Sequence, residues 1–240
     1  GNFEAMPSQF VHYYSLGKGY YFGDKSIKNT TIENNIAINT ANVGMHVDHT
    51  LNSVNNIVRN NVLYDAGVRG FSFSDYSNYI TCPDGSPPGC TYVPQYNDIV
   101  YGNEVYSFEP THESLWFIRV YDDGGNPPQG TAFGDFYDNY FYHPYRQNDN
   151  IFMDYTFFEG QNQKTIAQFQ SYFNQPPAGQ APNRYTGYTL TNPDLEAEIY
   201  YNDTLAPKVV NVGNGGCDKD RNPLVGNKTI QPFTSLVVEF

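Results

Sequence analysis

One short pattern returns four times in the first part of the chain and constrains the fold more than any other feature. Each copy places an Asn directly before a short run of strand-forming residues. The four are Asn35, Asn61, Asn103 and Asn139, and they are spaced 26, 42 and 36 residues apart. A shortest repeat of about 25 residues is typical of solenoids and other repeat proteins.

A second type of strand lies between these copies. It recurs at residues 19–22, 44–47, 70–73, 115–120 and 150–153. Short β-branched and aromatic strands without intervening helices predict an all-β fold, and we expect a parallel β-helix of about five coils over residues 1–160. A stacked Asn suits such a fold, because its amide can bond the turn backbone and the next Asn where φ and ψ are unusual. An antiparallel sandwich is the alternative.

The longer spacings predict two loop insertions, near residues 75–95 and 122–132, overhanging the same face. Long loops on a rigid stack are a usual place for binding. The first insertion contains Cys82 and Cys90, which bracket a Pro- and Gly-rich string that a disulfide could close; two free thiols are the alternative. The paired state fits an extracellular, periplasmic or cell-surface location. Cys217 is left over as a loop thiol.

The character of the sequence changes after Gly160. Residues 161–184 predict a short amphipathic helix followed by a Pro- and Gly-rich linker. Residues 185–240 predict strands and hairpins that cap the last edge of the stack. The string from Asp218 to Asn222 is similar to the start of a calcium loop but lacks its Gly and distal Glu. We therefore expect a hairpin turn and no cofactor, with calcium as the alternative.

Charge excludes several partners. The formal net charge is -12 and the pI is about 4.6, so the chain repels phosphate backbones and anionic membrane surfaces. No apolar run approaches the roughly 20 residues of a membrane helix. The sequence begins without an initiator Met or a signal-like apolar segment, as expected of a processed protein or an excised fragment. We therefore expect neither nucleic-acid binding nor membrane insertion.

Residues 19–160 resemble the right-handed parallel β-helix repeat proteins that bacteria secrete. The tail, with Asn192-Pro-Asp, Tyr201-Asn and the run from Gln231 to Val238, is similar to the C-terminal segment of their polysaccharide-active members. This resemblance implies a polysaccharide-degrading enzyme, a hydrolase ahead of a lyase, with a polysaccharide or oligosaccharide as partner. Non-catalytic carbohydrate binding and a structural or surface-assembly role are the alternatives. Upstream coils or a partner chain are expected to complete the stack.

Alternation in the second strand type predicts one outward stripe on the stacked coils. It sends Trp116, Ile118 and Val120 inward, like Met45 and Val47. The predicted stripe consists of Tyr21, His46, Asp48, Ser72, Ser74, Phe117, Arg119, Tyr121 and Asp154. Aromatic rings, hydroxyls and a few charges suit the apolar faces and hydroxyls of a sugar chain. We expect a glycan groove, to which His49, Asp122 and Asp123 contribute; a solvated face is the alternative.

The densest titratable cluster is His46-Val-Asp48-His49, with Asp75 one coil later. Cleavage of a glycosidic bond needs two carboxyl groups. Asp48 and Asp75 are the predicted acid and base, assisted by His46, and the Asp122-Asp123 pair is a further source of carboxyls. A lyase would instead need a base such as His46 or Arg119. No metal site is expected, because His46, Asp48 and His49 are more simply explained as surface polar residues at a turn.

Overall fold

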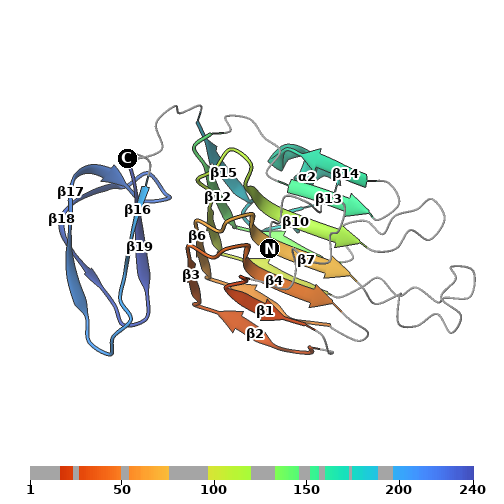
Figure 1. The fold of residues 1–240 in the computed structure, drawn as a ribbon, viewed down its shortest axis with the longest axis horizontal. Helices are drawn as coiled ribbons and strands as arrows, with labels where there is room; N and C mark the ends of the chain where they lie inside the picture. The colour runs from red at the N-terminus through yellow and green to blue at the C-terminus, as the bar shows by residue number, and fades with distance from the viewer. Residues whose placement is uncertain are drawn as a thin grey trace, which may run out of the picture.

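The computed structural model describes residues 17–23, 27–49, 54–75, 97–119, 133–145, 152–156, 160–172, 175–188 and 197–240. Within these ranges the chain is mostly β-strand, with one short helix (Figure 1). Three sheets of mainly parallel strands stand beside an antiparallel C-terminal sheet. The expectation of an all-β fold is confirmed.

Each of the three parallel sheets takes its strands from successive parts of the chain. Sheet I contains, in spatial order, β1 (Tyr20–Phe22), β4 (Val43–His49), β7 (Arg69–Asp75), β10 (Glu113–Arg119), β13 (Phe152–Thr156) and β14 (Gly160–Lys164). Sheet II contains β2 (Thr31–Glu33), β5 (Ile57–Arg59), β8 (Asp98–Tyr101) and β11 (Gly134–Tyr137). Sheet III contains β3 (Ile36–Ile38), β6 (Val62–Tyr64), β9 (Glu104–Tyr106), β12 (Tyr140–His143) and β15 (Arg184–Gly187).

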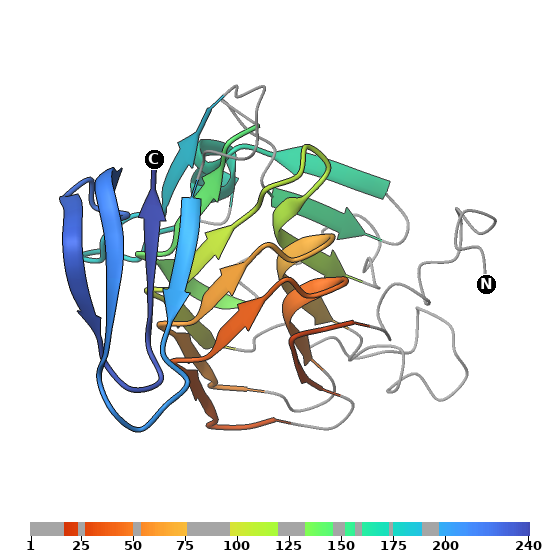
Figure 2. The same ribbon diagram turned by 60° about the vertical axis from the view of Figure 1, so that its left-hand side comes forward.

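The chain visits sheets II, III and I in turn, and we call each such passage a circuit. Strands β2 to β4, β5 to β7, β8 to β10 and β11 to β13 form successive circuits, stacked side by side in Figures 1 and 2. Neighbouring circuits pair in parallel, and only β14 joins its neighbour β13 in the antiparallel sense. The antiparallel sandwich is therefore wrong for these strands.

Apolar side chains of like position stack between the three sheets to form the core. The buried cluster includes three aligned rows: Ile32, Val58, Val100 and Phe136 from sheet II; Ala37, Leu63, Val105 and Phe141 from sheet III; and Val47, Phe73 and Phe117 from sheet I. Side chains alternate between the two faces of a strand. The register of neighbouring circuits therefore brings like side chains together in the interior.

The repeated Asn forms the continuous ladder that the sequence predicted. The amide oxygen of Asn61 accepts hydrogen bonds from the backbone N–H and the side-chain amide of Asn35, at 3.0 and 2.9 Å. Asn61 donates in the same way to Asn103, Asn103 to Asn139, and Asn139 to Asn183, which the sequence analysis had not included. The ladder therefore satisfies buried polar groups at each turn from sheet II to sheet III.

A different residue adopts the unusual backbone conformation at each of these turns. Asn34, Asn60, Gly102 and Asp138 directly precede ladder residues and have φ of 58°, 54°, 65° and 51°. Gly, Asn and Asp tolerate this left-handed region better than other residues. The sequence interpretation assigned both roles to one Asn, whereas the structure divides them between two neighbours.

Phe117 corrects the predicted orientation of β10. In the register of sheet I, Phe117 pairs with Phe73 and Trp116 with Ser72, so Phe117 enters the core and Trp116 lies on the outer face. Ile118, also predicted inward, is the register partner of the outward Ser74. The run Leu-Trp-Phe-Ile contains no polar residue to set the alternation. The inward position suits Phe117, whose ring contacts Phe133 and lies 5.7 Å from the stacked ring of Phe169.

The last circuit is closed by β14 and by helix α2 (Ile166–Tyr172). Phe169 of α2 is fully buried in the core cluster, and Ile166 packs against that cluster. This agrees with the predicted short amphipathic helix. Strand β15 then returns to sheet III, so the parallel sheets continue past the predicted boundary at residue 185.

The C-terminal sheet lies against the outer face of sheet III rather than over the last strand edge (Figure 2). Its strands are β16 (Ala197–Tyr201), β17 (Lys208–Cys217), β18 (Pro223–Ile230) and β19 (Ser235–Glu239), in the spatial order β16-β19-β17-β18. Val237 packs against Tyr106, Tyr140 and Tyr142. Tyr140 also donates a 2.7 Å hydrogen bond to the buried carboxyl of Glu239. The aromatic face of sheet III thus needs this cover.

The turn from Asp218 to Asn222 is a hairpin turn, as predicted. The Asp218 carboxyl accepts hydrogen bonds from the backbone N–H groups of Asp220 and Asn222 at 2.9 and 2.8 Å. The Asp218 carboxyl is therefore engaged in hydrogen bonds to the backbone of its own turn. In the described part of the chain, no helix is both long and apolar enough to cross a membrane.

Candidate functional site

The outer face of sheet I brings together four of the predicted site residues. Tyr21 of β1, His46 and Asp48 of β4, and Ser74 of β7 lie on three neighbouring strands. The pairing register places Tyr21 opposite His46 and Asp48 opposite Ser74. Because Met45, Val47 and the other inward residues hold these strands on the core, the outward side chains have fixed spacing.

Asp48 is the centre of this arrangement, which we call the Asp48 network. Its two carboxyl oxygens accept hydrogen bonds from different strands: Tyr21 OH donates to Oδ2 at 2.6 Å and Ser74 Oγ to Oδ1 at 2.6 Å. His46 Nε2 lies 2.7 Å from Ser74 Oγ. The ring of Tyr21 also meets that of His46 edge-on, with centroids 5.3 Å apart. Four side chains of the stripe therefore act as one unit.

Proton positions in the network follow from the donors. Ser74 has one hydroxyl proton, which it donates to Asp48, so His46 must donate from Nε2 to Ser74 Oγ. This arrangement is the reverse of a serine nucleophile beside a basic histidine. Two short O–H···O contacts suit an ionised acceptor. The network presents Asp48 as a carboxylate, able to accept a proton or bind a hydroxyl.

Exposure differs sharply within the network. Tyr21 is 37% exposed, whereas Asp48 is 8% exposed and His46 and Ser74 are buried. Lys18 Nζ lies 4.0 Å from the centre of the Tyr21 ring, a cation–π geometry. Tyr21 is therefore the contact surface of the network, and Asp48 lies just behind it.

Ser72 and Trp116 occupy the same face, beside the network. The Ser72 hydroxyl is buried and makes no hydrogen bond within the described residues. Trp116 pairs with Ser72 in register, and the Arg69 guanidinium carbon lies 3.2 Å from the centre of the Trp116 ring. Sequence analysis missed both Arg69 and the outward Trp116. Pairing of Trp116 with Ser72 could have identified the outward Trp116. Arg69 carried no such signal, because alternation puts it in phase with the inward Phe71 and Phe73.

Three further predicted residues are placed only by their backbone. The Cα atoms of His49, Asp75 and Arg119 are register partners, one position beyond Asp48 and Ser74 along sheet I. They form one row at the ends of β4, β7 and β10. Because strand positions alternate between faces, this row continues the inward positions Val47, Phe73 and Phe117 rather than the outward ones. Arg119, predicted in the outward stripe, is thus out of phase with it. Tyr121, Asp122, Asp123, Cys82 and Cys90 lie outside the described residues.

Within the described ranges, no group of three His, Cys, Asp or Glu residues could hold a metal ion. Cys217 is a free cysteine whose sulfur accepts a 3.5 Å hydrogen bond from Arg221; it ends strand β17 rather than lying in a loop as predicted. The described part of the outer face of sheet I presents a carboxylate, hydroxyls and an imidazole.

Comparisons of the chain with family models, with curated proteins and with solved structures found no match.

Proposed function

We propose that this chain is a secreted right-handed parallel β-helix protein that binds and hydrolyses a polysaccharide along the outer face of sheet I. The observation that carries the proposal is the Asp48 carboxylate, held between the hydroxyls of Tyr21 and Ser74 at 2.6 Å each. The cyclic order of sheets II, III and I supports the β-helix. Such a stack offers one continuous face to an extended chain.

Hydrolysis of a glycosidic bond needs a carboxylate and a carboxylic acid on the two sides of the bond. We assign the first role to Asp48, which takes a proton from the attacking water. Asp75 is the proposed acid, protonating the oxygen of the leaving sugar, and Asp122 and Asp123 are alternative acids. His46 acts through Ser74, as a positioning residue that holds the hydroxyl toward Asp48.

The substrate of this proposal is a sugar chain of low negative charge. A net charge of -12 opposes the approach of a polyanion. The exposed ring of Tyr21 offers an apolar surface to a sugar face, beside a carboxylate that can accept sugar hydroxyls. A hydrolase is therefore favoured over a lyase, whose substrates carry uronate carboxylates.

A non-catalytic carbohydrate-binding protein is the second candidate. This candidate is favoured because both carboxyl oxygens of Asp48 already accept hydrogen bonds from hydroxyl groups. A bound sugar hydroxyl could replace one of these donors without any reaction. The two candidates differ in whether Asp48 transfers a proton.

The decisive experiment compares two Asp-to-Asn changes. Purified wild type, Asp48→Asn and Asp98→Asn are incubated with a polysaccharide panel and assayed for new reducing ends and for the absorbance of unsaturated uronates. Asp98 is the control, because its buried carboxyl also accepts bonds from a neighbouring circuit, from the backbone and side chain of Asn56. It belongs to sheet II, away from the proposed groove.

We expect Asp48→Asn to lose at least about a hundredfold in turnover, while Asp98→Asn keeps wild-type turnover. Circular dichroism should show both variants folded. Equal turnover in wild type and Asp48→Asn would refute the assignment of Asp48. Glycan binding by the wild type without any new reducing ends would favour the second candidate.

A further inference from the structure

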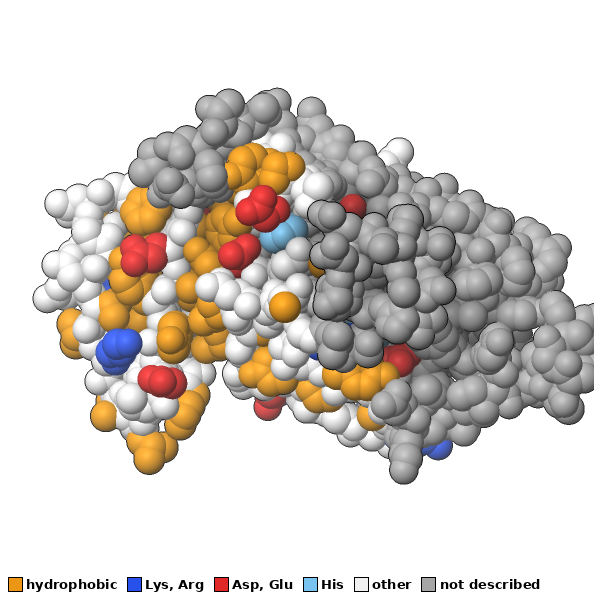
Figure 3. Space-filling model, viewed as in Figure 1, with side chains coloured by type: hydrophobic (Ala, Val, Ile, Leu, Met, Phe, Trp, Pro, Cys, Tyr) orange, Lys and Arg blue, Asp and Glu red, His pale blue; other side chains and the backbone are white. Residues whose placement is uncertain are grey.

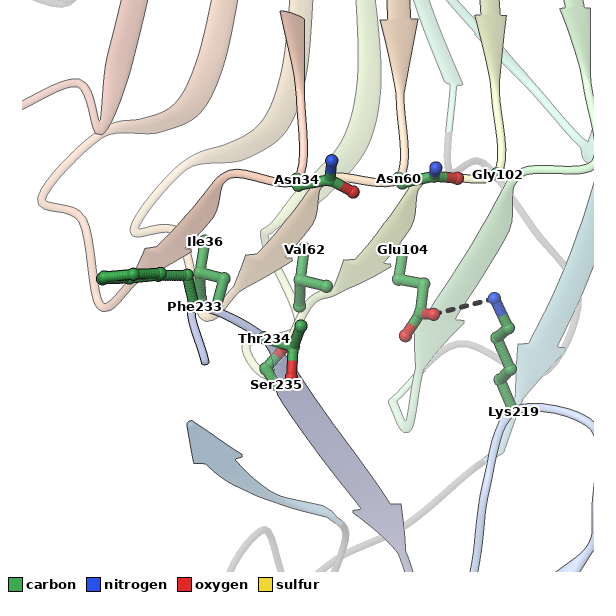
Figure 4. A pocket seen from close by; sticks show the side chains of 10 residues that line it. All are labelled: Asn34, Ile36, Asn60, Val62, Gly102, Glu104, Lys219, Phe233, Thr234 and Ser235. Carbon is green, nitrogen blue, oxygen red and sulfur yellow. Dashed lines mark ion pairs between the residues drawn. The ribbon is translucent and has the colours of Figure 1, made fainter. Parts of the chain in front are cut away.

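A pocket separate from the Asp48 network lies between the outer face of sheet III and the C-terminal sheet. The surface is hollowed between these two parts of the molecule (Figure 3). The pocket has a volume of about 200 Å³ and is lined from one side by Ile36, Val62 and Glu104, and from the other by Lys219 and the β18–β19 turn (Figure 4). The proposed hydrolysis makes no use of it.

Phe233 is the most unusual residue of this pocket. It has φ of 56° and remains 55% exposed, although bulky residues rarely adopt positive φ. The turn is fixed by hydrogen bonds from Phe233 N–H to the Asn202 carbonyl at 2.8 Å and from Asn202 N–H to the Thr234 carbonyl at 3.0 Å. Such strain is usually kept where a function needs it. Its ring, edge-on in Figure 4, lies beside Ile36 and so forms an apolar wall.

Two side-chain amides supply polar groups along the same pocket. Asn34 and Asn60 occupy equivalent turns of neighbouring circuits, and their amides lie side by side in Figure 4. Both residues are exposed, and neither side chain makes a hydrogen bond within the described residues. This contrasts with the ladder residues one position later, Asn35 and Asn61, whose side-chain amides both donate to the next ladder amide. The pocket therefore presents a row of donors and acceptors to a ligand.

The charged groups of the pocket are already paired. Lys219 Nζ lies 2.8 Å from Glu104 Oε1, and Tyr106 OH donates to Glu104 Oε2 at 3.0 Å. A charged ligand would have to displace these bonds. A neutral ligand would add its own hydroxyls to the amides and leave the ion pair intact.

From these features we infer that the pocket binds a single neutral sugar ring. The apolar wall of Phe233, Ile36 and Val62 suits the CH face of a pyranose, and the amide row of Asn34 and Asn60 suits its hydroxyls. The volume is below the roughly 300 Å³ at which sites for drug-sized ligands begin, which fits one ring rather than a longer chain. This inference does not rest on the proposed hydrolysis.

The test is a titration of the full chain, labelled for NMR, with glucose, galactose, mannose and xylose at millimolar concentrations. We expect shifts of the backbone amides of Gly102 and Thr234 with at least one sugar. Phe233→Gly should weaken this binding at least about tenfold, because glycine adopts the same positive φ without the ring. Asn60→Gly should also weaken it.

Phe240→Ala is the matched control, because Phe240 is an exposed aromatic, 53% accessible, that does not line the pocket. It should bind like the wild type, as should Asp48→Asn. The inference is overturned if none of the four sugars shifts the pocket amides, or if Phe233→Gly binds as tightly as Phe240→Ala. Binding that survives in Asp48→Asn separates this site from the outcome of the hydrolysis experiment.

Discussion

The asparagine ladder and the Asp48 network both carry polar side chains from one circuit to the next, but only the ladder is uniformly neutral. Within the ladder, Asn61, Asn103 and Asn139 each accept hydrogen bonds from one equivalent and donate to the next, as Asn61 does with Asn35 and Asn103. In the network, the Asp48 carboxylate accepts hydrogen bonds from two different hydroxyls, the phenol of Tyr21 and the alcohol of Ser74. The ladder repeats the same amide-to-amide hydrogen bond from circuit to circuit, whereas the network joins different side chains at a single place.

This difference indicates that the ladder contributes to the stability of the fold, whereas the network contributes a reactive group. A buried polar group costs free energy unless it is bonded, and a neutral amide pair avoids the further cost of burying a charge. The ladder meets both conditions at every circuit. The network keeps the Asp48 carboxylate just behind the solvent-exposed Tyr21. A charged group in this position can contact a ligand but adds little to the stability of the core.

The largest expected effect tests the structural half of this comparison. Asn61→Ala should destabilise the fold by roughly 3 kcal/mol or more, because it removes the acceptor for Asn35 and leaves buried groups unbonded. Urea unfolding followed by circular dichroism measures the loss.

The neighbouring residue is the control for this prediction. Asn60→Gly should change stability by no more than about 1 kcal/mol, because its φ of 54° suits glycine and its side chain is exposed. If the two variants unfolded at the same urea concentration, the ladder would not be the source of stability.

A smaller effect distinguishes two serines of the same strand. Ser74→Ala should cost about 1–2 kcal/mol, since the buried Nε2–H of His46 loses its acceptor. Under the proposed function it should also reduce turnover, because Asp48 Oδ1 loses the hydrogen bond from Ser74.

Ser72→Ala supplies the matched comparison. Ser72 is equally buried, but its hydroxyl has no hydrogen-bond partner in the described part of the chain. Its removal should leave stability within about 0.5 kcal/mol of the wild type or raise it slightly. If Ser72→Ala and Ser74→Ala lost the same stability in urea unfolding and the same turnover, the hydrogen bonds assigned to Ser74 in the network would be contradicted.

The smallest effect concerns a second tyrosine–carboxyl pair, Tyr140 with Glu239. Burial raises the pKa of Glu239, and this outweighs the hydrogen bond from Tyr140 and the charge of Arg221. A raised folded-state pKa contributes stability below the unfolded pKa of about 4.3, and this is lost as pH rises through the folded pKa. Glu239→Gln should therefore resemble the wild type in acid and melt at a higher temperature near neutral pH.

Thermal unfolding at several pH values measures this difference, with Glu198→Gln as the exposed control. Glu198 likewise accepts a hydrogen bond from a tyrosine hydroxyl, that of Tyr200, but at an exposed position. A melting-temperature difference that does not change with pH would show that ionisation of Glu239 is not linked to folding.

Much of the parallel architecture was predictable, because each circuit repeats the same pattern of residues along the sequence. Asn35, Asn61, Asn103 and Asn139 have one role in each circuit, and strand alternation placed Met45 and Val47 inside. The same alternation correctly placed His46, Asp48 and Ser74 on one outer face. Where polar and apolar residues do not alternate, as around Phe117, the sequence contained no information on which face is buried.

The sequence by itself therefore determined the all-β class, the ladder and the residues that meet around Asp48. Only the tertiary structure decided that Phe117 is core and Trp116 is outward, since the register with β7 sets that choice. It also decided that the C-terminal sheet covers sheet III instead of the last edge, because the aromatic face of Tyr106, Tyr140 and Tyr142 had to be buried. Local patterns set alternation within a strand, whereas contacts between distant segments select the surface that each element covers.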